Sequence, residues 1–240
     1  MSFYPCHSDP ACLVFYARIV ARRPGAVCLD KSYFYPGGGG QLSDRGVLRW
    51  VDGEANVTHI EPEDGRFWHC IDADIPSDDV IGVIDEHFRS LMCQLHTDLH
   101  LLNALVYQHF DSALVTGVQM AADGTARIDF DLPGADNQRL RDIEPELNGM
   151  ILADLPVHAL YVPAAEVERE AGLVRSRSVA PPRQDNDMVR IIEIEGLDRQ
   201  ACGGTHLART SQSRPVRILK IENKGQRNRR IRIGLVDDAA

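Results

Sequence analysis

Long apolar runs are absent from this chain of 240 residues. The longest one, residues 11–21, is interrupted by Arg18 and is shorter than the about 20 residues that a membrane-spanning helix needs. The first ten residues have neither a basic start nor an uninterrupted apolar segment, so we expect no secretory signal. The sequence therefore predicts a folded cytoplasmic protein without a transmembrane helix.

Two common catalytic signatures are also missing. The glycine run Gly37–Gly40 lacks the Gly-Lys-Ser/Thr ending of a phosphate-binding loop, and a strand-like segment follows it instead of a helix. No Gly-x-Ser-x-Gly element is present, so a serine hydrolase has no support. The glycine run predicts either a turn with several positive φ angles, or a close approach of the backbone to a ligand or to a neighbouring domain.

The six cysteines are scattered through a chain with no export signal, which favours thiols or metal ligands over a disulfide framework. The formal net charge of −9 argues against non-specific binding to nucleic acid, because a negative field repels phosphate. The charge is segregated, however, since residues 209–232 contain nine Lys and Arg and only one acidic residue.

The pattern of apolar residues changes near residue 85. Before it, short β segments and turns predict a small β-barrel or sandwich over residues 1–84. After it, apolar residues recur at spacings of three and four, as in an amphipathic helix; they are Phe88, Leu91, Met92, Leu95, Leu99, Leu102, Leu105 and Val106. We therefore predict a domain boundary near residue 85 and a second domain over residues 85–240.

The second domain is predicted to have an α+β fold with a mostly antiparallel sheet. Residues 126–133 alternate strictly between apolar and polar side chains, as in a half-exposed strand, and residues 143–155 return to helical spacing. Further strands are predicted at residues 157–162, 188–196, 216–223 and 229–236, and a polar loop at residues 175–187.

Two pairs of residues have the spacing of metal ligands. His96 and His100 lie four residues apart on the predicted long helix, on one face of it, although this pair alone also fits ordinary core or rim residues. Cys202 and His206 flank a glycine turn that lets both side chains point inward. Together they predict a tetrahedral zinc site.

The number of ligands leaves the role of the zinc open. Four protein ligands are typical of a closed structural site, whereas catalysis needs a position for water or substrate. Cys93, one turn before His96, is a competing ligand or, as we favour, a buried thiol.

The basic residues near the C-terminus gather around a turn between two predicted strands. They form either a solvated face or a surface for RNA phosphates, and the clustering of arginines favours RNA. The residues predicted to contact phosphate are Lys224, Arg227, Arg229 and Arg230.

Four segments carry a resemblance to a known family. They read LDKSYFYPGGGGQLSDRG, HTDLHLLNAL, VTGVQMAADGTARIDFDLPG and IEGLDRQACGGTHLARTSQSRPVRILKIENKGQRNRRIRIGL. Over about residues 26–235 the chain resembles the free-standing alanyl-tRNA editing proteins of medium length and the editing domain of alanyl-tRNA synthetase. The editing domain of threonyl-tRNA synthetase shares the two metal pairs but typically not the Cys-Gly-Gly-Thr-His segment.

The resemblance implies hydrolysis of the ester that joins a wrong amino acid, chiefly serine and sometimes glycine, to alanine tRNA. It implies that His96, His100, Cys202 and His206 are zinc ligands, and that a small glycine-rich domain precedes the editing domain. The other possibilities are a tRNA-binding module with a structural zinc and no catalysis, and a threonyl-type editing deacylase.

Some pocket residues differ from the pattern of the relatives. Ser32 stands where relatives that reject serine commonly have threonine, and Asp98 lies between the two helix histidines. We expect Asp98 to face solvent, the alternative being an acid beside the metal. Thr116 and Gln119 fall in a segment where relatives place polar pocket residues, so with Ser32 they are candidates for binding the amino acid or positioning water.

Overall fold

The computed structural model describes residues 4–177, 183 and 186–236. The chain forms two compact units. The first, the barrel unit, consists of the described residues up to Gly38 together with Leu42–Ser90. The second, the α+β unit, consists of Gly39–Gln41 and the residues from Leu91 onward. The tip of the glycine-rich loop therefore belongs to the second unit, although its two stems belong to the first.

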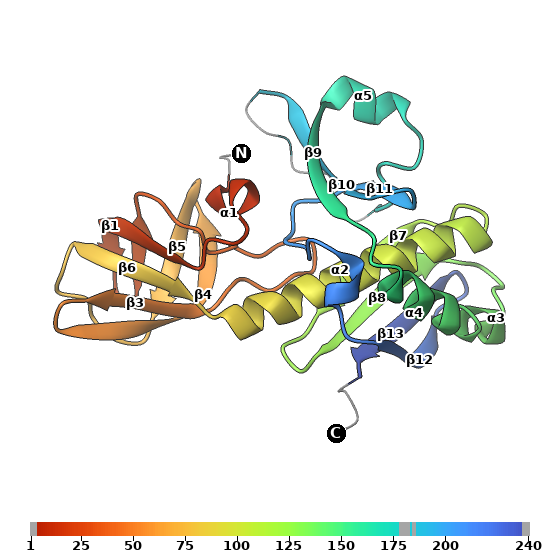
Figure 1. Cartoon of the computed structure of the whole chain (residues 1–240), viewed down its shortest axis with the longest axis horizontal. Helices are drawn as coiled ribbons and strands as arrows, with labels where there is room; N and C mark the ends of the chain where they lie inside the picture. The colour runs from red at the N-terminus through yellow and green to blue at the C-terminus, as the bar shows by residue number, and fades with distance from the viewer. Residues whose placement is uncertain (1–3, 178–182, 184–185, 237–240) are drawn as a thin grey trace. The chain divides into compact units, whose positions relative to one another are not determined.

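The barrel unit is a closed antiparallel barrel with the strand order β1-β2-β5-β4-β3-β6 (Figure 1). Side chains alternate between the interior and the outer face, as in β1, where Phe15 and Ile19 are buried and Tyr16 is exposed. The small β-barrel predicted from the sequence is confirmed. The elements are α1 (Pro5–Ser8), β1 (Val14–Arg23), β2 (Ala26–Leu29), β3 (Gly46–Trp50), β4 (Gly53–Glu63), β5 (Arg66–Ile71) and β6 (Asp79–Ile84).

A buried ion pair closes the base of the glycine-rich loop in the barrel unit. Tyr35 and Asp44 exchange hydrogen bonds across the loop, and the buried carboxylate of Asp44 pairs with Arg89. Arg89 also donates to the carbonyl oxygen of Tyr33 at 2.9 Å. A buried carboxylate needs such partners because its desolvation is costly. The ion pair therefore holds the segment that leads into the glycines.

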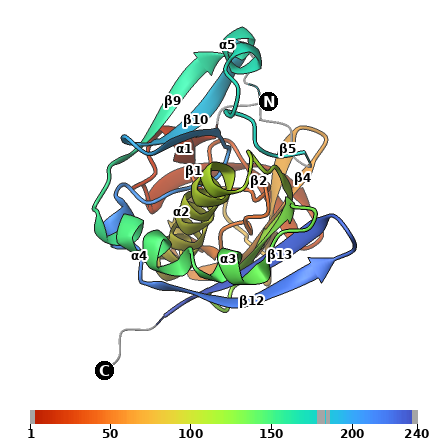
Figure 2. The same ribbon diagram turned by 90° about the vertical axis from the view of Figure 1, so that its right-hand side faces the viewer.

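In the α+β unit, helix α2 (Glu86–His109) runs between a four-stranded and a three-stranded antiparallel sheet (Figures 1 and 2). The sequence predicts one apolar face, but both faces are covered: Leu101 and Ala104 are as buried as Leu95 and Leu102. The four-stranded sheet, in the order β12-β13-β8-β7, is built from β7 (Val115–Met120), β8 (Thr125–Asp131), β12 (Val216–Lys224) and β13 (Asn228–Leu235).

The remaining elements complete the α+β fold, which is confirmed. The three-stranded sheet has the order β11-β10-β9, with β9 (Val157–Pro163), β10 (Met188–Ile194) and β11 (Asp198–Ala201). The predicted second helix is α4 (Glu144–Leu152); the sequence analysis did not predict β7, β11, α3 (Asn137–Arg141), α5 (Ala164–Arg169) or the short η1 (Thr210–Gln212). The predicted loop at 175–187 lies partly outside the described residues.

In the described part of the chain, no helix has the length and apolar character needed to cross a membrane.

Candidate metal centre

The four predicted ligands come together in the α+β unit. One ligand atom from each of His96, His100, Cys202 and His206 lies within 4.8 Å of the others. The Sγ of Cys202 is 3.3 Å from Nε2 of His96 and 3.4 Å from Nε2 of His206. The two helix histidines face the same way because residues four apart share a face of α2.

This geometry fits zinc. Bonds of about 2.0–2.3 Å in a tetrahedral site place neighbouring ligand atoms about 3.3–3.8 Å apart, which is the spacing of the sulfur and the two nitrogens here. Three imidazoles and one thiol form a donor set that zinc prefers. As whole residues, His96 and His100 are buried, whereas Cys202 and His206 are of intermediate exposure.

Burial also sets the protonation of the ligands. It lowers the pKa of His96 well below its usual value and that of His100 to about 3, so both imidazoles are neutral and able to bind a metal. It raises the pKa of the Cys202 thiol. Metal binding therefore requires the loss of a proton from Cys202, and acid opposes it.

Side chains beside the ligands orient two of the imidazoles. Gln41 Oε1 accepts a hydrogen bond from His96 Nδ1 at 2.8 Å and another from the Thr205 amide at 3.0 Å. Thr97 Oγ1 lies 3.3 Å from Nδ1 of His206. With Nδ1 engaged, Nε2 of each ring is directed at the cluster. The sequence analysis missed Gln41, Thr97 and Thr205, although each lies inside or next to a motif that it singled out.

The Cys-Gly-Gly-Thr-His turn needs a glycine for space. A Cβ atom on Gly204 would overlap the ring of His96 and lie 2.7 Å from Oε1 of Gln41. The buried guanidinium of Arg190 holds the turn, donating to the carbonyl oxygens of Cys202 at 3.0 Å and Gly204 at 2.8 Å. The backbone of this turn is thereby held in close contact with the ring of His96.

The glycine run has the positive φ angles that the sequence predicts, and its last residue packs closely against β7 of the same unit. All four residues of Gly37–Gly40 have positive φ, between 59° and 123°. A Cβ atom on Gly40 would lie 2.5 Å from the carbonyl oxygen of Val118, and the carbonyl of Gly40 accepts from the Met120 amide at 2.8 Å. The close approach to β7 sets the path by which Gln41 reaches His96.

Asp98 corrects one expectation. It is fully buried instead of facing solvent, and Ser213 Oγ donates to its Oδ2 at 2.9 Å. Burial raises the pKa of Asp98 to about 8. The solvent-facing interpretation was wrong because α2 is covered on both sides, so a polar residue off the apolar stripe is not thereby exposed.

The three predicted pocket residues are divided between the two units. Thr116 and Gln119 are on β7; Oγ1 of Thr116 is buried without a hydrogen-bond partner in the described part of the chain, and Oε1 of Gln119 accepts from Arg127 at 3.1 Å. Ser32 is in the barrel unit, where its Oγ lies 2.8 Å from Nε2 of the buried His69. The described contacts bring neither β7 residue to the four ligands.

His69 makes the stability of the barrel depend on pH. Burial lowers the pKa of His69 from 6.5 to about 4, so the folded barrel binds fewer protons than the unfolded chain between these values. The free energy of unfolding of the barrel is therefore highest above pH 6.5 and decreases by about 3 kcal/mol as the pH falls towards 4. Both tryptophans, Trp50 and Trp68, lie in the barrel unit, so their fluorescence during denaturant unfolding at several pH values measures this loss.

The control for this prediction is a matched pair of substitutions. His69→Asn should flatten the pH dependence, whatever its effect on stability at neutral pH. His87→Asn removes an exposed imidazole of the same unit and should leave the dependence unchanged. Equal slopes for all three proteins would contradict the prediction.

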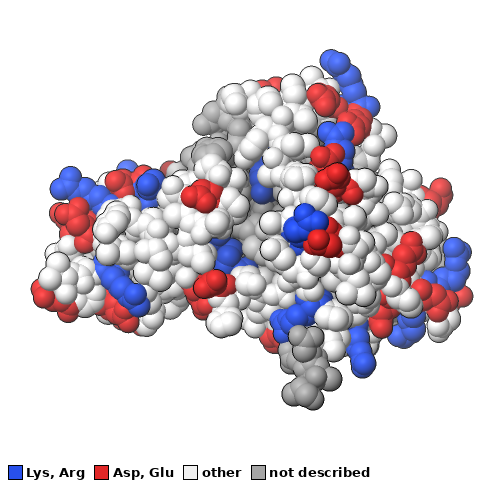
Figure 3. Space-filling view, viewed as in Figure 1, with Lys and Arg blue, Asp and Glu red and all other residues white. Residues whose placement is uncertain are grey.

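Several basic residues of the β12–β13 hairpin already form contacts within the protein. Arg229 is buried, with its guanidinium directed at the carbonyl of Ala135, and Arg230 makes two bonds of 2.7 Å to Asp129. Lys224 and Arg227 remain exposed on 45% and 69% of their side chains, although Arg227 contacts Asp131. Basic and acidic side chains are interspersed on the face in Figure 3.

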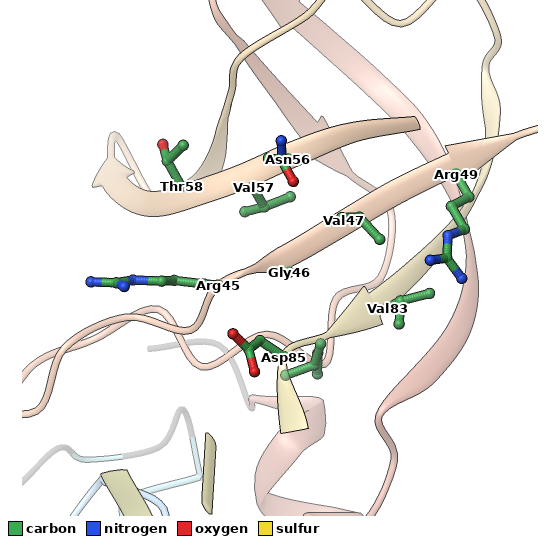
Figure 4. Close-up of a pocket in the computed structure, with 10 residues that line it drawn as sticks. Arg45, Gly46, Val47, Arg49, Asn56, Val57, Thr58, Val83 and Asp85 are labelled. Carbon is green, nitrogen blue, oxygen red and sulfur yellow. The ribbon is translucent and has the colours of Figure 1, made fainter. Parts of the chain in front are cut away.

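A separate cavity lies on the outer face of the barrel. It has a volume of about 690 Å³, and Val47 and Val83 lie between its rim residues, which include Arg45, Arg49 and Asp85 (Figure 4). Its lining contains no imidazole or thiol. The barrel unit has a second group of possible metal ligands away from this cavity, His59, Glu61 and Cys70, of which the first two are exposed.

Comparisons with known proteins agree with these features. Residues 189–232 match the family described as threonyl and alanyl tRNA synthetase second additional domain, and residues 13–88 match class II (A) tRNA synthetases. The chain is 38% identical over 220 residues to the alanyl-tRNA editing protein AlaX-M of Methanosarcina barkeri, covering 88% of this chain and 89% of that protein. The chain belongs to the AlaX-M family.

Other relatives give the same assignment. The AlaX-M protein of Saccharolobus solfataricus is 35% identical over 222 residues, covering 90% of this chain and 92% of that protein. The alanine–tRNA ligase of Methanopyrus kandleri is 36% identical over 198 residues, which is 80% of this chain but only 21% of the ligase. The AlaX-M match thus spans both units, and the matched segment at 189–232 contains Cys202, His206 and the basic hairpin.

Proposed function

We propose that this protein is a zinc-dependent deacylase of the cytoplasm that hydrolyses the ester between alanine tRNA and a wrong amino acid, chiefly serine and sometimes glycine. The observation that carries the proposal is the gathering of His96, His100, Cys202 and His206 in a member of a family of alanyl-tRNA editing proteins. The protein would act in trans, on tRNA charged by a separate synthetase.

The residues of the chain have separable roles in this proposal. Zinc, when bound, supplies a Lewis acid to the oxygen or nitrogen that it contacts. Gln41 and Thr97 hold the imidazoles of His96 and His206 in place. An aminoacyl ester is already activated, so correct positioning of the ester and a water is a large part of what catalysis requires. Ser32, Thr116 and Gln119 are the proposed residues for that positioning.

A structural zinc in a tRNA-binding module is the second candidate, because four protein ligands usually describe a closed site. The similarity to alanyl-tRNA editing proteins over most of the chain favours the enzyme. A deacylation assay with Ser-tRNA, Gly-tRNA and Ala-tRNA, all on alanine tRNA, separates the candidates. Binding without turnover would support the module. With serine on threonine tRNA as a fourth substrate, turnover of that substrate alone would support a threonyl-type editor.

Ser32 is predicted to set the amino-acid preference. A site built to bind a hydroxyl rejects an analogue that lacks it far better than an apolar pocket rejects an extra one, where discrimination is only about 100-fold. Ser-tRNA should therefore be cleaved much faster than Ala-tRNA. Ser32→Ala should erode the ratio of the two rates, whereas Ser32→Thr should preserve or sharpen it. Equal ratios for the three proteins would show that specificity lies elsewhere.

The basic hairpin is predicted to contact tRNA phosphates. Replacing Lys224, Arg227, Arg229 and Arg230 with alanine should weaken tRNA binding without loss of zinc. Lys224 and Arg227 are the more exposed of the four, so we expect them to make most of the phosphate contacts and the double variant to weaken binding nearly as much as the quadruple one. Each lost contact should reduce the slope of log K against log salt by about one.

The control for the hairpin removes the same charge elsewhere. Arg18 and Arg49 are exposed on 67% and 54% of their side chains and lie in the barrel unit. The double variant Arg18→Ala/Arg49→Ala should bind tRNA with the parent affinity and salt slope. If the hairpin variants do the same, the hairpin is a solvated face.

A further inference from the structure

The environment of His69 determines which of its ring nitrogens carries the proton. His69 is 1% exposed and lies on β5, facing the barrel interior. Its Nδ1 is 3.3 Å from the carbonyl oxygen of Val27, and a carbonyl oxygen can only accept a hydrogen bond. Burial keeps the ring neutral by lowering the pKa of His69 to about 4. A neutral ring that donates from Nδ1 has an unprotonated Nε2.

The protonation of His69 in turn fixes the hydroxyl of Ser32. Nε2 of His69 is 2.8 Å from Oγ of Ser32, and an unprotonated Nε2 can only accept, so Ser32 donates its proton to His69. The Phe34 amide donates to the same Oγ at 3.3 Å. A hydroxyl has one donor and two acceptor positions. One acceptor position therefore remains on Ser32, and no donor.

We propose that His69 is a positioning residue that makes Ser32 a hydrogen-bond acceptor only, so that the group Ser32 recognises on a substrate is a donor. The ammonium group is common to esterified serine and alanine, so the donor proposed for Ser32 is the hydroxyl of the serine. The methyl group of alanine offers no hydrogen bond. This inference rests on the proposed function for the identity of the substrate, but the direction of the hydrogen bond between Ser32 and His69 does not depend on it.

Two substitutions separate the effect of His69 on Ser32 from a general effect of replacing a histidine of the barrel. His69→Asn keeps a donor near the position of Nδ1 for the Val27 carbonyl but removes the acceptor for Ser32. The Ser32 hydroxyl is then able to rotate and donate. The matched control is His59→Asn on the neighbouring strand β4, where the ring is exposed and contacts Thr58 and Glu61 instead of Ser32.

The first measurement is nitrogen NMR of the histidine rings in the full chain at pH 7. The proposal predicts a proton on Nδ1 of His69 and none on Nε2, with the Nε2 signal shifting in Ser32→Ala and the Nδ1 signal staying in place. A proton on Nε2, or an Nε2 signal that does not respond to Ser32→Ala, would overturn the proposal. This measurement involves no tRNA, so it decides the matter even if the protein proves to have no deacylase activity.

The second measurement is the ratio of deacylation rates for Ser-tRNA and Ala-tRNA on alanine tRNA. His69→Asn should lower the ratio about tenfold, the worth of one well-placed hydrogen bond, while His59→Asn leaves it unchanged. In a Ser32→Ala background, His69→Asn should have no further effect, because His69 acts through Ser32. An active His69→Asn variant with the parent ratio, or independent effects of the two substitutions, would overturn the proposal. Absence of activity in the parent would instead refute the proposed function.

Discussion

Replacing Cys202 with alanine is expected to reduce the zinc content from one ion per chain to almost none and to abolish deacylation. Cys202 is the one sulfur ligand of the cluster, and its Sγ lies within 3.4 Å of Nε2 of both His96 and His206. Loss of a side chain that merely orients a ligand costs about 10–100-fold in metal affinity, so loss of a ligand should cost more. Metal analysis of the purified protein and a competition titration with a chelator measure the change.

Cys93→Ala is the control for this prediction. Cys93 is also a buried thiol of the α+β unit, but its Sγ lies 3.2 Å from Oγ1 of Thr205 and it is not among the clustered ligands. This variant should keep its zinc. If purified parent protein held no zinc and kept its full activity after chelation, the metal centre would be refuted.

Gly204→Ala is expected to disrupt the same centre without removing any ligand. The added methyl group would overlap the His96 ring, so His96 or the Cys202–His206 turn has to move. Neither has room, since Gln41 holds His96 and Arg190 holds the turn. We expect a loss of zinc affinity of at least 100-fold, measured by chelator competition, and a corresponding fall in the rate of deacylation.

The matched control is Gly149→Ala in helix α4. A Cβ atom at Gly149 meets nothing within 4 Å, and alanine is favoured over glycine in a helix by up to about 1 kcal/mol. This variant should bind zinc like the parent and unfold at the same or a higher temperature. If Gly204→Ala behaved in the same way, the close approach of the turn to His96 would be contradicted.

The sequence predicted the parts of the fold that have a strong period. Helix α2 and the paired strands β12 and β13 follow from regular apolar spacing. Strand β7 was missed because it is short, contains Gly117 and has an irregular register beside it. The burial of Asp98 was missed because a single sequence does not show that a second layer covers α2.

The candidate site likewise has a part that could be predicted from the sequence and a part that could not. The clustering of the four candidate ligands could be predicted because the spacing within each pair reflects local geometry, one turn of helix and one glycine turn. Gln41 was missed because its contact with His96 joins residues 55 positions apart. The acidic partners of the basic hairpin were missed for a related reason, since Asp131 and Asp129, which pair with Arg227 and Arg230, lie about 100 residues earlier on β8.

We propose that this chain uses zinc to hydrolyse serine from alanine tRNA while sparing alanine. The most direct test measures deacylation of Ser-tRNA and Ala-tRNA, both on alanine tRNA, by the zinc-loaded protein, the chelated protein and the chelated protein resupplied with zinc. We expect the zinc-loaded protein to release serine rapidly and alanine slowly. Chelation should abolish the release of serine, and addition of zinc should restore it. Release of serine that persists in the fully chelated protein, or no release by the zinc-loaded protein, would contradict it.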